Sequence, residues 1–547
     1  MQDLGLVTEY LHRIPPEQGV PLQLEFRLAR GDRQKLSLIL AAQKSQLPIV
    51  PSLDQTRAAL RLILGDSPDL IFRDMLLGKD GRRALLLFTD NLIKREQVMG
   101  MINVLTIKLR KENWPAQAAA LTNFLTHRAA IATEVNAANS LGDVTSAILS
   151  GDSVLLVDGL TVGVRLSTRG WEHRPPEQPL TEPVVRGPKE GFTETLSVNL
   201  SLMRRRIQSE SLRIETMVLG ERSRTTVAIL YIAGLTLPSL VDETRKRLNR
   251  IRIDAVYESG TIEELIQDSP MSLFPLMKQT ERPDVVESQL LQGKVALLTD
   301  GTPHCLTFPA TFAGEMQAAE DYYQHWTAGS LMRLLRYLFL LVALLGPSTY
   351  IAVTTYHQEM LPTQLLLSLM ASREGLPFPA VVEALLMEIS LEALREAGVR
   401  LPRPVGQSIS IVGGLIIGES AVRAGLVSPV MVIVVALTAI SSFIIPIYAA
   451  GFSIRILRFP MMLLAGTLGF YGMVLGLLVI SVHLASLRSF GVPYMSPTMP
   501  PTAQDMQDLM IRAPWWYMRK RPQFMPLQDR QRVGENGKPG PGKGKEG

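Results

Sequence analysis

Three long stretches without a charged side chain limit what this chain can fold into. No Asp, Glu, Lys or Arg occurs in 337–355, 424–454 or 459–487. An uncharged helix of about 18 residues is already long enough to cross the ~30 Å hydrocarbon core of a bilayer. A helix of a soluble protein rarely stays apolar on every face for that length. The sequence therefore predicts an integral membrane protein.

The region before these stretches is polar and mixed in charge. The formal net charge is +5 over 547 residues, and Lys and Arg are interspersed with Asp and Glu, unlike a nucleic-acid-binding surface. Cys305 is the single cysteine, which excludes disulfides within the chain and suits a reducing compartment. Met1 to Leu40 is charged and broken by prolines, so no signal peptide is expected there. We expect a cytoplasmic N-terminal region.

This N-terminal region alternates between helical and strand patterns. Strands are expected at 83–89, 151–159, 225–232 and 293–301, and helices at 55–65, 91–110, 193–217, 237–249 and 284–292. The nonapeptides 151–159 and 293–301 share the pattern G-x-x-x-L-L-x-D-G, which predicts a duplication into two related α/β subdomains. Alternation of strands and helices favours largely parallel sheets.

Each nonapeptide ends in an Asp-Gly pair, Asp158-Gly159 and Asp300-Gly301. Such a pair could belong to a metal or phosphate site. It also supplies the positive φ that a tight turn after a strand requires, and we favour this structural interpretation.

The predicted fold is thus an α/β cytoplasmic region of two related subdomains followed by an α-helical polytopic membrane domain. The expected domains are an N-terminal extension (1–53), two α/β subdomains (54–190 and 191–327), a transmembrane domain (328–487) and a basic C-terminal tail (488–547), disordered from about 530. Arg512, Arg519, Lys520 and Arg521 stand beside Trp515, Trp516 and Tyr517, a combination typical of a membrane surface.

The number of membrane spans is open between four and five. After the first span, spans are expected at 404–424, 428–450 and 459–484. The acidic helix 378–397 either lies in the membrane interface or stands in the membrane beside a water-filled pathway. Four spans return the tail to the cytoplasm but place Arg455 and Arg458 outside, against the positive-inside rule.

Polar residues within this membrane region are the candidate ion pathway or gate, because an ionisable residue at membrane depth is costly and marks a pathway or a specific partner. These candidates are Glu388, Glu392, Glu419, Gln407, Ser408 and Ser410. Glu419 lies four residues before Arg423, so a simple surface ion pair is the alternative. Small residues at helical spacing are candidates for helix packing: Gly414, Gly418, Gly466, Gly469, Gly472 and Gly476.

No catalytic signature is present in the sequence. The seven histidines are scattered, and neither HExxH nor GxSxG occurs. We expect neither an enzyme nor a cofactor or metal site.

Several long motifs are similar to one family. The stretch 182–207, EPVVRGPKEGFTETLSVNLSLMRRRI, resembles the signature of the GerA family of spore germination proteins, specifically the A subunit of germinant receptors. The agreement continues through 151–159, 257–270, 298–312, 373–429 and 512–522, and covers about 54 to 525.

The resemblance implies a non-enzymatic protein of the spore inner membrane. It implies partnership with a permease-like B subunit and a lipoprotein C subunit in sensing nutrients and triggering germination. It also implies a homo-oligomer that conducts ions, with the nutrient pocket in the B subunit. Carboxylates of 378–397 and hydroxyls of 404–424 are groups that a cation pathway could use in place of hydration.

Three hypotheses follow. The chain is a germinant-receptor A subunit that forms or gates a pore. Alternatively, it is the A-subunit-like protein of the sporulation-specific dipicolinate-channel operon, which amplifies germination without sensing nutrients. In the third hypothesis, it is a scaffold that assembles the receptor while ions move through a partner.

Overall fold

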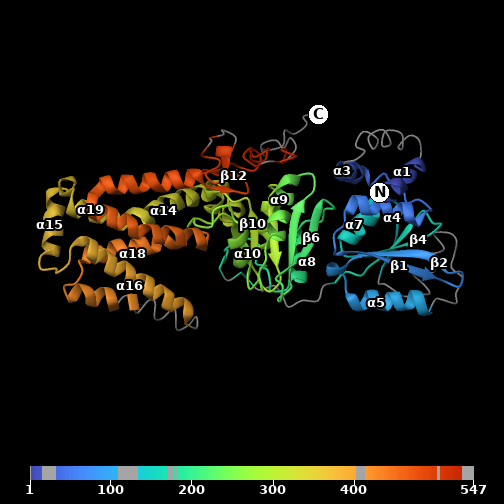
Figure 1. Cartoon of the computed structure of the whole chain (residues 1–547), viewed down its shortest axis with the longest axis horizontal. Helices are drawn as coiled ribbons and strands as arrows, with labels where there is room; N and C mark the ends of the chain where they lie inside the picture. The colour runs from blue at the N-terminus through green and yellow to red at the C-terminus, as the bar shows by residue number, and fades with distance from the viewer. Residues whose placement is uncertain are drawn as a thin grey trace, which may run out of the picture.

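The computed structural model describes residues 2–14, 33–108, 134–170, 178–179, 181–401, 413–414, 416–499, 501, 505–525 and 527–532. Two α/β domains and a bundle of long helices follow one another along the longest axis of the molecule (Figure 1). The second α/β domain lies between the first domain and the helices.

The first domain is a five-stranded sheet covered on both faces. The strands are β1 (Leu70–Leu77), β2 (Arg82–Thr89), β3 (Val135–Ala138), β4 (Ser153–Val157) and β5 (Gly163–Leu166). The helices are α1 (Gln2–His12), α3 (Arg33–Gln43), α4 (Leu53–Leu64), η1 (Asp90–Leu92), α5 (Arg95–Asn103), η2 (Val104–Lys108) and α7 (Leu141–Leu149). Leu85 and Leu87 pack under α1, α3, α4 and α7, whereas Leu86 packs under α5. Because side chains alternate across a strand, a run apolar at every position fits a sheet buried on both faces.

The second domain repeats this plan. Its strands are β6 (Leu212–Leu219), β7 (Thr225–Ile232), β8 (Lys278–Thr280), β9 (Val295–Thr299) and β10 (Cys305–Phe308). Its helices are α8 (Leu196–Arg206), α9 (Pro238–Asn249), α10 (Ser259–Ile266) and α11 (Pro283–Leu290). The strand orders β1-β2-β4-β5-β3 and β6-β7-β9-β10-β8 are equivalent, as expected of a duplication. Helices α8 and α11 cover one face, and α9 and α10 cover the other.

The two Asp-Gly pairs occupy equivalent positions in the two domains and have the same structural role. Gly159 and Gly301 have φ values of 88° and 90°, in the left-handed region that favours glycine. The carboxylate of Asp158 accepts the N–H of Leu53, the first residue of α4, at 3.1 Å. The carboxylate of Asp300 accepts the N–H of Leu196, the first residue of α8, at 3.0 Å. Both pairs therefore form a turn and satisfy a free donor at a helix N-terminus.

Three sequence predictions for these domains are wrong. The sheets are antiparallel at every pairing described, not parallel. Even β2–β4 and β7–β9, whose connections contain helices, are antiparallel, because the chain re-enters each sheet at the end where it left. The helix expected over 193–217 ends with α8 at Arg206, and β6 follows. The segment 1–53 is not an extension: Tyr10 and Leu40, from α1 and α3, lie in the core beneath α4.

The helical region contains α14 (Trp326–Thr355), α15 (Thr363–Arg373), α16 (Ala380–Arg400), α18 (Pro429–Phe443) and α19 (Tyr448–Ser486). Short helices α12 (Phe312–Glu315), α13 (Glu320–Tyr323) and η4 (Gln358–Met360) flank α14. Within the described residues, α14 and α19 are the two helices long and apolar enough to cross a membrane, and α18 is shorter. About half of the expected span 404–424 falls outside the described residues, and 416–423 is helical.

Helix α19 is broken at Gly469, whose φ of 61° and ψ of −141° are not helical. Gly472 lies against the Leu464 carbonyl and Gly476 against Met461, with no room for a Cβ at either glycine. Residues that far apart could not touch along a straight helix, which rises 1.5 Å per residue. The two halves therefore form a helical hairpin (Figure 1).

Helix α16 runs lengthwise through the bundle. Arg395 contacts Ser442 of α18 near one end of α16, and Glu383 contacts Ser428 near the other. Glu388 and Glu392 meet Arg458 and Arg455 in the reverse order along α19. Helix α16 is thus parallel to α18 and antiparallel to the first half of α19. This arrangement matches a helix standing among the candidate spans rather than lying across their ends.

The C-terminal segment returns to the second α/β domain. The strands β11 (Arg488–Ser489) and β12 (Val492–Pro493) follow α19, and the short helix η5 (Asp505–Asp508) comes after them. Ser489 Oγ donates to the Leu276 carbonyl at 2.6 Å. Leu527 packs against the core of the second domain, beside Gly293. The expected disorder from about 530 concerns residues that, from 533 on, lie outside the described part.

Candidate functional site: charged residues buried in the helical region

A carboxylate and a guanidinium are paired in the interior of the bundle. Glu388 of α16 is 0% exposed, and Arg458 of α19 is 1% exposed. Arg458 Nη1 donates to Glu388 Oε2 at 2.5 Å, and Arg458 Nε donates to the Ala343 carbonyl of α14 at 2.8 Å. This pair joins three helices at one point.

The hydrogen-bonding capacity of this pair is only partly used. Within the described residues, Glu388 Oε1 and Arg458 Nη2 are buried without a hydrogen-bond partner. Burying two charges costs several kcal/mol per ion, which the attraction between them offsets only when the remaining polar atoms are also bonded. The sequence predicted Glu388 as a membrane-depth carboxylate but not its partner.

A second cluster lies one helical turn along α16. Glu392 pairs with Arg395 of the same helix at 2.8 Å and with Arg455 of α19 at 3.2 Å. Two guanidinium groups thus share one carboxylate. Both arginines are mostly buried, with side chains 13% and 8% exposed. Arg455 and Arg458 therefore lie inside the bundle, on a helix that begins at the end facing the α/β domains, and not in an outer loop.

The other predicted polar residues differ in surroundings. Glu419 pairs with Arg423, and both side chains are more than half exposed, in accord with the surface-pair alternative. Gln407, Ser408 and Ser410 lie outside the described residues. Glu383 is 0% exposed and accepts the N–H of Ser428 at 2.5 Å.

The six candidate packing glycines differ in their surroundings. Gly466 lies against Val381 of α16, and Gly469 against Tyr356 and His357, so these positions have no room for a side chain. Gly472 and Gly476 face the other half of the α19 hairpin. Gly418 is in ordinary contact distance of Val432, while Gly414 has no neighbour within 4 Å among the described residues. The predicted Gly414–Gly418 packing face is therefore not visible as a pair.

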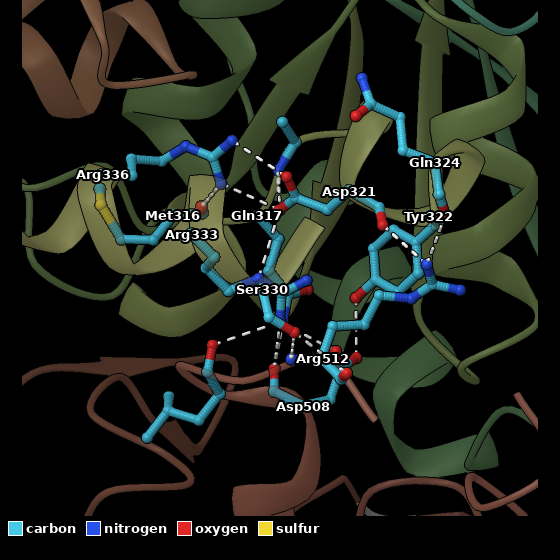
Figure 2. Close-up of polar contacts among 12 residues, drawn as sticks. Met316, Gln317, Asp321, Tyr322, Gln324, Ser330, Arg333, Arg336, Asp508 and Arg512 are labelled. Atoms are coloured by element: carbon cyan, nitrogen blue, oxygen red, sulfur yellow. Dashed lines mark hydrogen bonds and ion pairs between the residues drawn. The ribbon is translucent and has the colours of Figure 1, made fainter. Parts of the chain in front are cut away.

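A third cluster joins the short helix α13, the start of α14 and the C-terminal segment (Figure 2). Asp321 accepts from Arg333 Nε at 3.2 Å and from Arg336 Nη1 at 2.9 Å. Arg333 also donates to the Asp508 carboxylate at 2.9 Å. Arg512 donates to the main-chain carbonyls of Asp321 and Gln324. Residues far apart in the sequence are thereby held at one junction.

This junction corrects the expectation for Arg512 of the basic tail, whereas Arg519 and Lys520 are exposed. Arg512 is 2% exposed and bonded within the protein, so it is not available to a membrane surface. Arg521 donates to the Leu291 carbonyl of the second domain at 3.0 Å. Trp515 and Tyr517 remain partly exposed. A run of basic and aromatic residues does not distinguish a membrane surface from a protein surface that offers carbonyl groups.

Within the described part of the chain, no group of three His, Cys, Asp or Glu side chains converges. The carboxylates of the bundle face guanidinium groups instead. Such clusters can hold helices in one arrangement and release them when a charge is removed.

Comparisons with known proteins place the chain in a family. It is 42% identical over 503 residues to spore germination protein KA of Bacillus subtilis (strain 168), covering 91% of this chain and 92% of that protein. It is 43% identical over 488 residues to the uncharacterized membrane protein YfkQ of the same organism, covering 89% and 94%. A solved structure, the N-terminal domain of the A subunit of the Bacillus megaterium spore germinant receptor GerK3, is 30% identical. The match covers 48% of this chain and 97% of the chain in that structure, with a TM-score of 0.39.

The family model described as Bacillus/Clostridium GerA spore germination protein matches residues 58–524. This range includes the sheet of the first α/β domain, all of the second, the helical bundle and most of the docked C-terminal segment, but not α1 and α3. The chain therefore belongs to the GerA family of spore germination proteins.

Proposed function

We propose that this chain is the A subunit of a spore germinant receptor and that its helical region forms or gates an ion pathway. In this proposal it lies in the spore inner membrane with the α/β domains in the cytoplasm. It assembles with a permease-like B subunit and a lipoprotein C subunit and forms a homo-oligomer. The family membership and the names of the relatives support the germination role.

The buried Glu388 and Arg458 pair is the observation that carries the gating role. It connects α16, α19 and α14 through one carboxylate, one guanidinium and one carbonyl. A buried ion pair with unsatisfied atoms is a weak source of stability and is better explained as selecting one arrangement of helices. A gate requires two arrangements of different free energy, and removing one charge changes their balance.

An ion-leak assay in liposomes tests this proposal. The full-length chain is reconstituted alone and with the B and C subunits, and cation release is followed without nutrient. Glu388→Gln removes the charge that holds Arg458, so we expect the leak to increase several-fold. The reversed pair, Glu388→Arg with Arg458→Glu, restores the attraction and is expected to lower the leak again.

Glu396→Gln is the matched control, because Glu396 lies on the same helix and pairs with Arg400 in an exposed position. A leak that decreases in Glu388→Gln would assign the carboxylate to the conducting path rather than to the gate. An unchanged leak with a correctly assembled complex would contradict both roles and leave the scaffold hypothesis.

A further inference from the structure

A cavity of about 710 Å³ lies between the second α/β domain and the helical bundle. Its walls come from the β8 region, from α14, and from the turn that connects α18 to α19. This turn, 444–447, lies at the end of the bundle that faces the α/β domains. The cavity is therefore bounded by both the polar and the apolar halves of the molecule.

The lining of this cavity is cationic. Among the described residues, five Lys or Arg side chains line it, against two carboxylates. The five cations are Lys278, Arg282, Arg336, Arg395 and Arg455. The carboxylates are already bonded: Glu182 accepts from Thr280 at 2.5 Å, and Glu320 accepts the N–H of Val185 at 2.5 Å. Burial also raises the pKa of Glu182, which favours its neutral form.

Arg282 and Arg336 are compensated by Asp284 and Asp321, which lie outside the lining, whereas Arg395 and Arg455 are compensated only in part. Arg395 and Arg455 share the single carboxylate of Glu392, which leaves one positive charge uncompensated. Arg455 makes its ion pair through Nη1 alone, at 3.2 Å. A guanidinium carries five N–H donors in a planar fork that matches phosphate geometry.

The cavity lies at the level where a bilayer surface would be. Arg336 on its wall is the last charged residue of α14 before the uncharged stretch that begins at Tyr337. Phe443 and Tyr448 also line the cavity and are 73% and 71% exposed. Exposed aromatic side chains beside basic residues are typical of the boundary between hydrocarbon and headgroups. Basic pockets between helices at this level bind anionic headgroups.

We propose that this cavity binds the phosphate headgroup of an anionic phospholipid, with Arg395 and Arg455 as the contacting cations. The acyl chains would leave past Phe443 and Tyr448 along the exposed apolar surface of the bundle. This inference rests on the membrane placement in the proposed function and not on ion conduction. A negative leak assay therefore leaves it standing.

Lipid retention by the intact chain tests the inference. The full-length protein is reconstituted in nanodiscs of phosphatidylcholine with phosphatidylglycerol, then released and examined by native mass spectrometry. The wild type is expected to retain phosphatidylglycerol. Arg395→Gln with Arg455→Gln should weaken retention about tenfold or more, since each cation near a membrane surface contributes ~1 kcal/mol. Arg395→Lys with Arg455→Lys keeps both positive charges, so this variant should retain most of the phosphatidylglycerol.

The matched control is Arg400→Gln with Arg423→Gln, which removes the same charge from exposed positions outside the cavity. Circular dichroism and gel filtration confirm that each variant is folded. Equal retention by the cavity variant and the wild type would overturn the inference, as would an equal loss in the control. Binding of inorganic phosphate by the cavity arginines without retention of phosphatidylglycerol would overturn it in favour of a free-anion site.

Discussion

Glu315 is a buried carboxyl group without a hydrogen-bond partner in the described part of the chain. It is 0% exposed, and neither of its oxygens accepts a hydrogen bond from the described residues. Burial raises the pKa of Glu315 to about 7, although Lys278 and Lys294 oppose this rise. The charges of Glu263 and Glu182 add to the rise. The folded protein therefore favours the protonated form of Glu315.

The pH dependence of stability follows from this shift. An unfolded Glu ionises near 4.5, whereas Glu315 in the folded chain ionises at about 7. The contribution of Glu315 to the free energy of unfolding is fully present below pH 4.5 and is lost as the pH rises through about 7. The loss amounts to up to ~3 kcal/mol. Burial lowers the pKa of Lys294 to about 7, so that group changes stability only above this window.

Thermal unfolding of the full chain in detergent, followed between pH 4.5 and 7, measures the effect. Gln cannot ionise, so Glu315→Gln is expected to reduce the fall in unfolding temperature over this pH range. Glu264→Gln, at an exposed position of α10, should leave the slope unchanged. Identical slopes for Glu315→Gln and the wild type would show that Glu315 does not titrate in this window.

Among residues of the candidate site, the sequence identified carboxylates but not their partners. Glu388 and Glu392 stand out because ionisable residues are rare at membrane depth. Arg458 meets Glu388 across 70 positions of the chain, and this contact depends on how α16 and α19 pack. A contact of this kind has no local signal. The same holds for Asp321, whose main-chain carbonyl meets Arg512 only after the C-terminal segment docks.

At the scale of elements, the strands found from sequence are those covered on both faces. β2, β4, β7 and β9 are inner strands with nearly continuous apolar runs. β1 and β6 are edge strands that contain charged residues, Arg73 and Asp74 in β1 and Arg213 and Glu215 in β6, so their apolar patterns are interrupted. β3, β5, β8 and β10 have four residues or fewer, too short for a periodic pattern. Without the edge strands, the remaining alternation of strand and helix suggests a parallel sheet.

The paired helix caps give a prediction at this scale. Asp158→Ala and Asp300→Ala each remove the acceptor for the first N–H of α4 or α8. Each is expected to lower the free energy of unfolding by about 1 kcal/mol. Because the two caps lie in different domains, the effects should add in the double variant.

Unfolding midpoints of the full chain in detergent measure these losses. Asp80→Ala, in the exposed turn between β1 and β2, is the control and should change little. If one cap variant resembled this control, the two Asp-Gly turns would not be energetically equivalent, in spite of their equivalent geometry.

At the scale of the whole molecule, the two α/β domains are joined by a buried ion pair. Arg204 of α8 donates to Asp69 of the first domain at 2.7 Å, and the two side chains are 1% and 2% exposed. Arg213 of β6 also donates to the Ile63 carbonyl at 3.1 Å. These contacts fix the orientation of one domain against the other.

Asp69→Asn leaves the buried guanidinium of Arg204 without its counter-charge, which costs about 3–5 kcal/mol when the pair is fully buried. We expect the domains to separate. Fluorophores on cysteines introduced at Lys79 and Arg222, both exposed, report the distance by energy transfer, because the native Cys305 is buried. Asp74→Asn, which affects an exposed pair with Arg57, should leave the transfer efficiency unchanged. Unchanged transfer in Asp69→Asn would show that other contacts suffice.

The docked C-terminal segment has a consequence for the order in which this protein is made. Ser489, Tyr494 and Leu527 occupy places on the second α/β domain, yet the ribosome produces them after every helix of the bundle. The second domain therefore remains incomplete until the chain beyond α19 has been synthesised. Its final closure waits for the last residues to return from the bundle. A nascent chain arrested before residue 488 would carry an open second domain, so synthesis itself delays the assembly of the junction until the bundle is in place.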